Sequence, residues 1–117
     1  MQYMALIYSD PSLEPAYGTP EFEVMMKGYF AFNETLKAAG AYVAGEGLKD
    51  VETATSLRIR GGKVETMDGP FAETKERLGG YYIFEVPDLD AALHFAAMIP
   101  SAAYGTIEVR PVMDYDA

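Results

Sequence analysis

The sequence predicts a single α+β domain, residues 1–117, in which two helices cover one face of an antiparallel sheet. Local patterns follow the order strand, helix, strand, hairpin, strand, helix, strand. Two of these strands are apolar on both faces, which is typical of strands in the middle of a covered sheet. The chain has 117 residues, 50% of them hydrophobic, which is enough for one proper core.

The first strand and the first helix follow from the N-terminal residues. Residues 4–8 form a continuous apolar run that ends at Asp10 and predicts an inner strand. A helix is predicted over 20–39, because Thr19 can cap it and Gly40 can end it in a left-handed conformation. Its apolar stripe is predicted to consist of Phe22, Met25, Met26, Tyr29, Phe30, Asn33 and Leu36.

A second strand and a hairpin are predicted next. The strand covers 41–47 and is weakened by its glycines. The hairpin strands, 56–60 and 63–67, flank two glycines that tolerate the positive φ angles of a tight turn. This two-residue turn sets a register that pairs Ile59 with Val64 and Arg58 with Glu65.

The C-terminal part is predicted to form a strand, a helix and a final strand. Residues 81–86 are apolar on both faces, as expected of a second inner strand. Asp88 can cap the helix that follows, and Pro100 stops it. Residues 105–110 are predicted to form a strand. Because Pro111 has no amide hydrogen to donate to a ladder, the strand either ends at Pro111 or lies at a sheet edge. The apolar stripe of this helix is predicted to be Leu89, Ala92, Leu93 and Ala96.

Without its hairpin, this order of elements is the ferredoxin-like split βαβ arrangement. The first and third strands are the inner ones in that arrangement, and they are the two that are apolar on both faces. Two helices cover only one face of such a sheet, so the other face would expose apolar side chains. We therefore expect a two-fold homodimer whose sheets face each other and enclose a cavity near the hairpin and Asp68.

Composition excludes several classes of function. The 9 basic and 18 acidic residues give a net charge of −9, which repels nucleic-acid backbones and anionic lipid surfaces. The absence of cysteine excludes disulfides and thiolate chemistry. No apolar run approaches the roughly 18 residues of a membrane span, and the N-terminus lacks the features of a secretory leader. We expect a cytoplasmic protein that binds neither nucleic acid nor membrane.

The segment from Asp68 to Gly80 is the predicted functional focus. Its first three residues, Asp-Gly-Pro, form a rigid corner, and ionisable residues follow. The Gly79-Gly80 pair can hinge or approach another group closely. The candidate ligand-binding residues of this segment are Asp68, Phe71, Glu73, Lys75 and Glu76.

The acidic residues of this segment have two interpretations. In a helical turn Glu73 and Glu76 would share one face, and with Asp68 they could ligate a hard cation or act as general acid and base. Solvated ion pairs with Lys75 or Arg77 are the favoured alternative on spacing alone. No metal site is therefore predicted.

Few other residues are candidates for catalysis or ligand binding. His94, the single histidine, lies about 140° around its helix from Leu89 and is predicted to lie on the surface. The serines lack a nucleophile-elbow context and a persuasive base. Arg58 and Tyr82 are weaker ligand-binding candidates, since Tyr82 could turn its hydroxyl towards a ligand, although a core role fits it better.

The run from Asp68 to Glu76, followed by Leu78-Gly79-Gly80-Tyr81-Tyr82, closely resembles the signature of the DGPF branch of the YCII-related family. The resemblance covers nearly the whole chain and implies a ferredoxin-like fold that assembles as a dimeric α/β barrel. The wider family includes a chlorohydroxyhydroquinone dehydrochlorinase, for which the implied catalytic pair is a histidine of the first helix and an aspartate before a proline. Neither carries over, because this first helix has no histidine and Ile99 stands before Pro100.

These observations predict a dimeric binding module for a small molecule. Two alternatives stay open: a lyase- or isomerase-type enzyme of the YCII kind with altered acid–base residues, and a regulatory partner of an extracytoplasmic-function sigma factor. The second alternative follows from the resemblance alone, because DGPF proteins are often encoded beside such sigma factors. No catalytic residue is assigned, and no cofactor is predicted.

Overall fold

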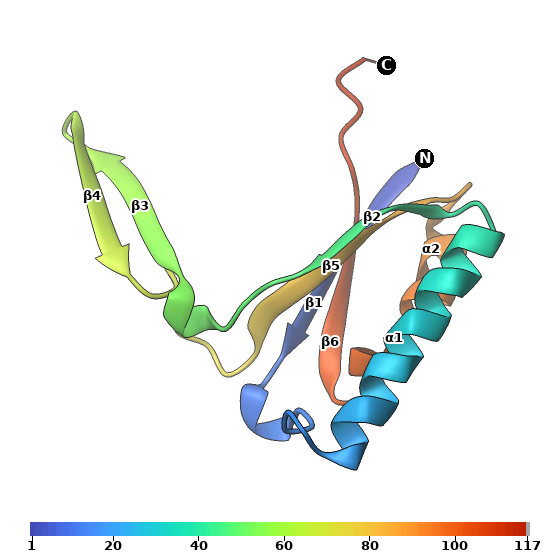
Figure 1. Ribbon diagram of the computed structural model, residues 1–117. Helices are drawn as coiled ribbons and strands as arrows, with labels where there is room; N and C mark the ends of the chain where they lie inside the picture. The colour runs from blue at the N-terminus through green and yellow to red at the C-terminus, as the bar shows by residue number, and fades with distance from the viewer. Residues whose placement is uncertain (117) are drawn as a thin grey trace.

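The computed structural model describes residues 1–116 and shows a four-stranded antiparallel sheet with two helices packed on one face (Figure 1). The inner strands are the first and third of this sheet along the chain, as predicted, so the ferredoxin-like α+β arrangement is confirmed. The helices are α1 (Pro20–Ala38) and α2 (Leu89–Ala96). The strands, in spatial order, are β2 (Tyr42–Gly47), β5 (Arg77–Glu85), β1 (Gln2–Ser9) and β6 (Gly105–Pro111). Three short 3₁₀ helices lie between them: η1 (Pro11–Leu13), η2 (Val51–Thr53) and η3 (Pro100–Ala103).

Helix α1 has the predicted caps and ends one residue earlier than predicted. The Thr19 hydroxyl accepts a hydrogen bond of 3.2 Å from a backbone amide of the first turn, and Gly40 follows the helix with a φ of +68°. The predicted stripe is wrong at Phe30, which is 65% exposed, whereas Phe32 is buried. Residues four apart share a helix face, so Phe32 and Leu36 point together into the core.

Helix α2 buries a different stripe from the predicted one. The two alanines of that stripe are buried, but Leu89 and Leu93 are 47% and 48% exposed. Phe95 and Ile99 pack on the core in their place, because the small alanines let this side of the helix approach the sheet. The helix ends before Pro100, which instead begins η3. Within residues 1–116, neither helix combines the length and the apolarity needed to cross a bilayer.

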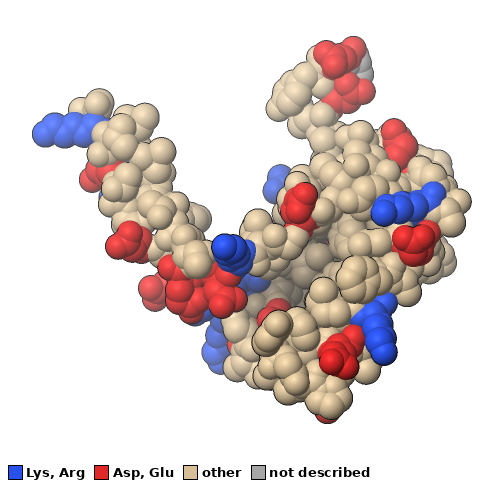
Figure 2. All heavy atoms as spheres, in the orientation of Figure 1, with Lys and Arg blue, Asp and Glu red and all other residues tan. Residues whose placement is uncertain are grey.

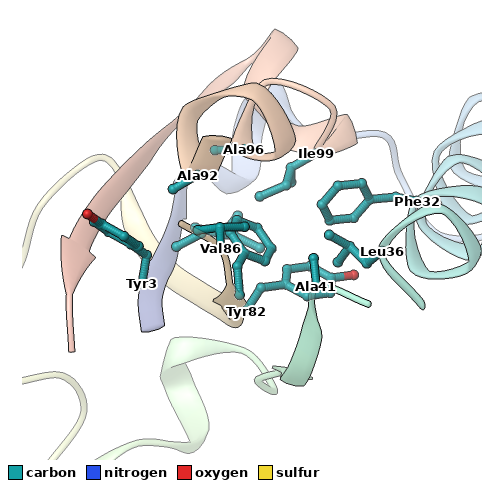
Figure 3. Packing of buried hydrophobic residues seen from close by; sticks show 12 residues of the cluster. Tyr3, Phe32, Leu36, Ala41, Tyr82, Val86, Ala92, Ala96 and Ile99 are labelled. Carbon is teal, nitrogen blue, oxygen red and sulfur yellow. The ribbon is translucent and has the colours of Figure 1, made fainter. Parts of the chain in front are cut away.

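The core lies between the two helices and the sheet (Figure 3). Every second residue of β1 is buried from Tyr3 to Ser9, which is the period of a strand with one face on the core. The ring of Phe32 meets the rings of Tyr82 and Phe84 at centroid distances of 5.1 and 6.2 Å. Aromatic side chains therefore join α1 to β5.

The inserted hairpin forms an arm that stands away from the main sheet. Its strands, β3 (Thr55–Arg60) and β4 (Lys63–Asp68), pair with each other in the predicted register. Gly61 and Gly62 adopt φ angles of +56° and +76°, as the tight turn requires. Figure 1 shows the arm on the side of the sheet opposite the helices. The radius of gyration is consequently 16.2 Å, against about 13 Å for a compact domain of similar length.

The segment between the arm and β5 departs from the prediction. Strand β5 begins at Arg77, so Gly79 and Gly80 lie within a strand and not in a loop. Glu73 and Glu76 do not share a helical turn, because residues 69–76 form bends and extended backbone. The ladder that pairs Arg77 with Ser9 of β1 holds this end of the segment in an extended strand.

Candidate functional site

A cavity of about 420 Å³ lies between α1 and the sheet, and we call it the helix–sheet cavity. Helix α1 forms one wall, and the floor comes from the neighbouring ends of β1, β2 and β5. Most of the lining is aromatic, methionine or glycine, with a few polar side chains. The lining side chains used below are Ser9, Glu14, Met26, Tyr29, Asn33, Tyr82 and Ser101.

Three polar pairs interrupt the apolar lining. The hydroxyls of Tyr29 and Ser101 share a hydrogen bond of 2.5 Å, which joins α1 to η3. The Tyr82 hydroxyl donates to the Asn33 side-chain oxygen at 2.7 Å. Ser9 is buried and its hydroxyl donates to the Glu14 carboxylate. Because Asn33 accepts through its oxygen, its amide group remains free to donate into the cavity.

Burial keeps the phenols of Tyr29 and Tyr82 in this site protonated near neutral pH. Burial, followed by the neighbouring tyrosines, raises the pKa of Tyr82 to about 12. Burial likewise raises the pKa of Tyr29 and of Tyr104, whose hydroxyl is buried without a hydrogen-bond partner among residues 1–116. These phenols can donate and accept hydrogen bonds, but they do not act as bases near neutral pH.

The raised pKa of Tyr82 predicts a loss of stability at high pH. Between pH 10.0, the usual value, and about 12, the unfolded chain releases a proton that the folded protein retains, so the free energy of unfolding falls as pH rises. Tyr82→Phe should weaken this fall, while costing about 1 kcal/mol at neutral pH through the lost hydrogen bond to Asn33. Denaturant unfolding at neutral pH and at about pH 11 measures both effects.

Tyr17→Phe is the matched control, because Tyr17 is 89% exposed. It should leave both the neutral-pH stability and its pH dependence close to those of the wild type. If the stability of the Tyr82→Phe variant depended on pH in the same way as that of the wild type, Tyr82 would not be the cause of the loss of stability at high pH.

Two glycines allow strands β2 and β5 to pack closely in the floor of the cavity. A Cβ at Gly45 would lie 2.7 Å from the Tyr82 ring, and one at Gly80 would lie 2.8 Å from the carbonyl oxygen of Glu46. Real Cβ atoms do not tolerate such distances, so both positions require glycine. The close approach predicted for Gly79-Gly80 is therefore made at Gly80, between β5 and β2.

The charged groups of the cavity are acidic. Within the described part of the chain, Glu14 and Glu46 line it, and no lysine, arginine or histidine does. Glu46 is paired with Tyr81, which alternates with the buried Tyr82, so the Glu46 side chain points to the other face of the sheet. The Glu14 carboxylate is thus the one charge beside the polar pairs, and the cavity disfavours anions.

The structure separates the seven predicted binding residues. Tyr82 lines the helix–sheet cavity, whereas Arg58 and Phe71 border a hollow of about 400 Å³ on the arm. Arg58 is also paired with Glu65, at 3.0 Å, as its register predicts. Glu73 and Lys75 border a shallow depression next to η1.

The remaining two predicted residues, Asp68 and Glu76, lie apart from both hollows. Glu76 accepts a hydrogen bond of 3.2 Å from Thr106 of β6. Asp68 ends β4, and the rigid corner predicted after it is present: Gly69 has a φ of +94°, and its amide donates to Ala54 at 2.7 Å. Within residues 1–116, no three carboxylate or histidine side chains are grouped closely enough to hold a metal ion. His94 is exposed, as predicted.

Sequence reasoning missed most of the polar groups in the cavity. Asn33 carried a usable signal, since it is a polar residue inside the apolar stripe of α1. Ser9 and Glu14 carried none, because their contact depends on how the short η1 segment turns the chain, and Ser101 carried none, because its partner Tyr29 lies 72 residues away in the sequence. Burial of a polar stripe residue requires a partner, and the partner of Asn33 is Tyr82.

Comparisons with known proteins give a family and a fold. A model of the YCII-related domain matches residues 1–116. An uncharacterized protein of Rhizobium meliloti (strain 1021) is 38% identical over 117 residues, covering 98% of this chain and 94% of the relative.

Among solved structures, the chain is similar to the 5-chloro-2-hydroxyhydroquinone dehydrochlorinase TftG from Burkholderia phenoliruptrix AC1100, in complex with 2,5-dihydroxybenzoquinone. The TM-score is 0.50 at 17% sequence identity, over 97% of this chain and 94% of that chain. At this identity the likeness shows a common fold and carries no residue roles. The domain match and the bacterial relative go further, and they show that this chain belongs to the family of YCII-related domain proteins.

Proposed function

We propose that this protein is a dimeric small-molecule-binding module of the DGPF branch, and that its ligand occupies the helix–sheet cavity. One observation carries the proposal: a cavity of about 420 Å³ with aromatic and methionine walls and a few convergent polar groups. Ligand sites for small molecules have this size, roughly 300–1,000 Å³, and this composition. The run from Asp68 to Glu76 supports the assignment to the DGPF branch.

The ligand is a compact, uncharged ring compound that carries oxygen. Aromatic walls favour a flat apolar body. The Asn33 amide provides donors for its oxygens, as does the one hydroxyl proton of the Tyr29–Ser101 pair that is not used between the two residues. The fold neighbour TftG holds an oxygenated ring compound, which supports this class. Anionic rings bind more weakly here, because no basic side chain lines the described cavity and Glu14 carries the same charge.

The dimer is supported by the sheet face that the helices leave bare. Met4, Leu6 and Tyr8 of β1, with Tyr81 and Ile83 of β5, are half-buried there, and they pair side by side across the two inner strands. A face of this kind on a small chain marks an interface. Sedimentation at micromolar concentration tests the dimer, and a monomer alone would contradict it.

The predicted loop residues keep a narrower role in the proposal. None of Asp68, Phe71, Glu73, Lys75, Glu76 and Arg58 lines the cavity of the single chain, so in the proposal they contribute an outer wall only to the cavity of the other chain in the dimer. Phe71 is 86% exposed in the single chain, so it is available for such a contact. A wall made of the Phe71 ring and the neighbouring charged side chains combines apolar and polar groups, as the walls of ligand sites do.

Filling the cavity should abolish ligand binding. Hydroquinone is the probe, and at about 100 times its dissociation constant it should stabilise the wild type by about 2.7 kcal/mol, seen as a rise in Tm. Met26→Trp should remove this rise, because Met26 lines the cavity and the indole occupies it. Benzoate should stabilise the wild type less than hydroquinone does.

Ala31→Trp is the control, since Ala31 is an exposed residue of the same helix outside the cavity lining. It should retain the rise in Tm. The double variant Phe71→Ala, Glu73→Gln separates the two walls: weaker binding supports an outer wall, and normal binding removes these residues from the site. An unchanged rise in the Met26→Trp variant would reject the cavity.

A second candidate is a lyase- or isomerase-type reaction on the same class of compound. The observation that favours it is the dehydrochlorinase activity named for the fold neighbour. Among residues 1–116, Glu14 is the one carboxylate turned to the polar cluster, so it is the candidate base. Turnover of a panel of hydroxylated and chlorinated rings tests it, and a rate that persists in Glu14→Gln would exclude Glu14.

A further inference from the structure

We infer that the arm, Thr55–Asp68, clasps a second copy of this chain and holds the dimer together. The inference rests on the proposed dimer and adds the surface that secures it. Two independent properties of the arm carry it, namely its exposed apolar side chains and its positive charge on an acidic protein.

The arm lacks a packing partner within the described chain. Each of its strands packs chiefly on the other, and the base of the arm is closed by a hydrogen bond of 2.9 Å from the Ser56 hydroxyl to the Gly69 carbonyl. The molecule measures 48 × 46 × 17 Å, much broader than it is thick. A lone two-stranded hairpin is at best marginally stable in water, so the arm needs a surface to pack on.

Most of the exposed apolar side chains of the arm lie on one of its faces. Leu57, Ile59 and Val64 share one face and are 62–64% exposed. Met67 lies on the other face, where it borders the hollow beneath Phe71. A cluster of this kind in water is a liability unless another surface covers it.

The charge of the arm identifies that surface as acidic. The arm has three basic and two acidic residues, a net charge of +1, whereas the whole chain carries −9. The remainder therefore carries −10. Figure 2 shows basic side chains at the outer end of the arm and acidic ones gathered at its base.

The charges at the tip of the arm also favour an acidic partner surface. Arg60 and Lys63 stand directly opposite each other across the turn. Like charges in this position destabilise a hairpin unless anions lie close by. No carboxylate within residues 1–116 forms an ion pair with either residue.

A second copy supplies both properties that the arm requires. Its body carries the negative charge, and its bare sheet face has an apolar row between two carboxylates, with Glu46, Tyr81, Leu6 and Glu108 side by side across four strands. In a two-fold dimer the arm of each chain contacts the body of the other chain, so no arm is left to bind a third copy. The hollow between arm and body in Figure 2 leaves room for the partner.

Reversing the charge at the tip tests the clasp. Arg60→Glu, Lys63→Glu keeps a like-charge pair across the turn, so the hairpin is disturbed little, but the attraction to an acidic partner becomes repulsion. We expect the dimer dissociation constant, measured by sedimentation, to rise by roughly tenfold or more. Added salt should weaken the wild-type dimer and strengthen that of the variant.

Lys27→Glu, Lys37→Glu is the matched control, because it reaches the same net charge from exposed positions on α1. It should change the dissociation constant much less. Equal weakening by both double variants, or by neither, overturns the clasp and leaves the proposed dimer standing. A wild-type chain that is monomeric overturns both.

Photo-crosslinking shows directly what the arm touches. The chain has no cysteine, so Thr66→Cys creates a single attachment point for a benzophenone label on the arm and keeps both charges of the tip. We expect crosslinks from the arm to the body of a second copy, distinguished by mixing isotope-labelled and unlabelled protein. Crosslinks confined to the same chain overturn the inference.

Discussion

Replacing Phe84 with alanine should lower the free energy of unfolding by about 3–5 kcal/mol, because the change removes a large side chain from the centre of the core. Phe84 is 0% exposed and lies on β5, an inner strand. Its ring lies 6.0 Å from that of Phe95 and 6.1 Å from that of Tyr82, so it joins α2 to the floor of the helix–sheet cavity. Denaturant unfolding followed by circular dichroism measures the loss.

Phe71→Ala provides the same chemical change at an exposed position. Phe71 is 86% exposed, so its loss should alter the stability of the single chain by only about 0.5 kcal/mol. A cost at Phe84 no greater than the cost at Phe71 would show that the core is packed differently.

Gly105→Ala should destabilise the protein by about 3 kcal/mol, because the new methyl group has no space. A Cβ at Gly105 would lie 2.2 Å from the carbonyl oxygen of Tyr8 and 3.0 Å from the Cβ of Ser9. The nearest atom belongs to backbone, so β6 must move away from β1. The same shift should weaken hydroquinone binding, because Ser9 and Ser101 both line the cavity beside this crossing.

Gly47→Ala is the control for this substitution. A Cβ at Gly47 meets nothing within 4 Å, although Gly47 also lines the cavity. The variant should be within about 0.5 kcal/mol of the wild type. If Gly105→Ala were as stable as Gly47→Ala, the close contact between β1 and β6 would be refuted.

Some errors of the sequence analysis share a cause. The stripes of α1 and α2 were placed by helical spacing alone, and spacing does not say which neighbouring residues the sheet covers. Phe30 and Phe32 both fit an apolar helix, and only the position of β5 decides that Phe32 is buried. The interpretation in which Glu73 and Glu76 share a helical face, which was not the favoured one, is not seen, since pairing with β1 extends β5 back to Arg77.

Local signals were sufficient wherever a single residue determines the backbone. Thr19 caps α1, Gly61 and Gly62 form the turn of the arm, and Gly69 takes a positive φ next to Pro70. The register of the arm followed from the length of its turn. The inner positions of β1 and β5 followed from apolar residues on both faces, because a strand inside a sheet meets a covered surface above and below.

The sequence by itself therefore determined the order of elements and the arrangement of the sheet. It also identified the segment from Asp68 to Gly80 as unusual. The tertiary structure decided where the helix–sheet cavity lies. It left six of the seven predicted binding residues outside the cavity lining, and it brought Ser9, Asn33 and Ser101 to the same cavity as Tyr82. Spacing along a chain describes neighbours on one element, whereas a cavity is formed by elements that meet only after folding.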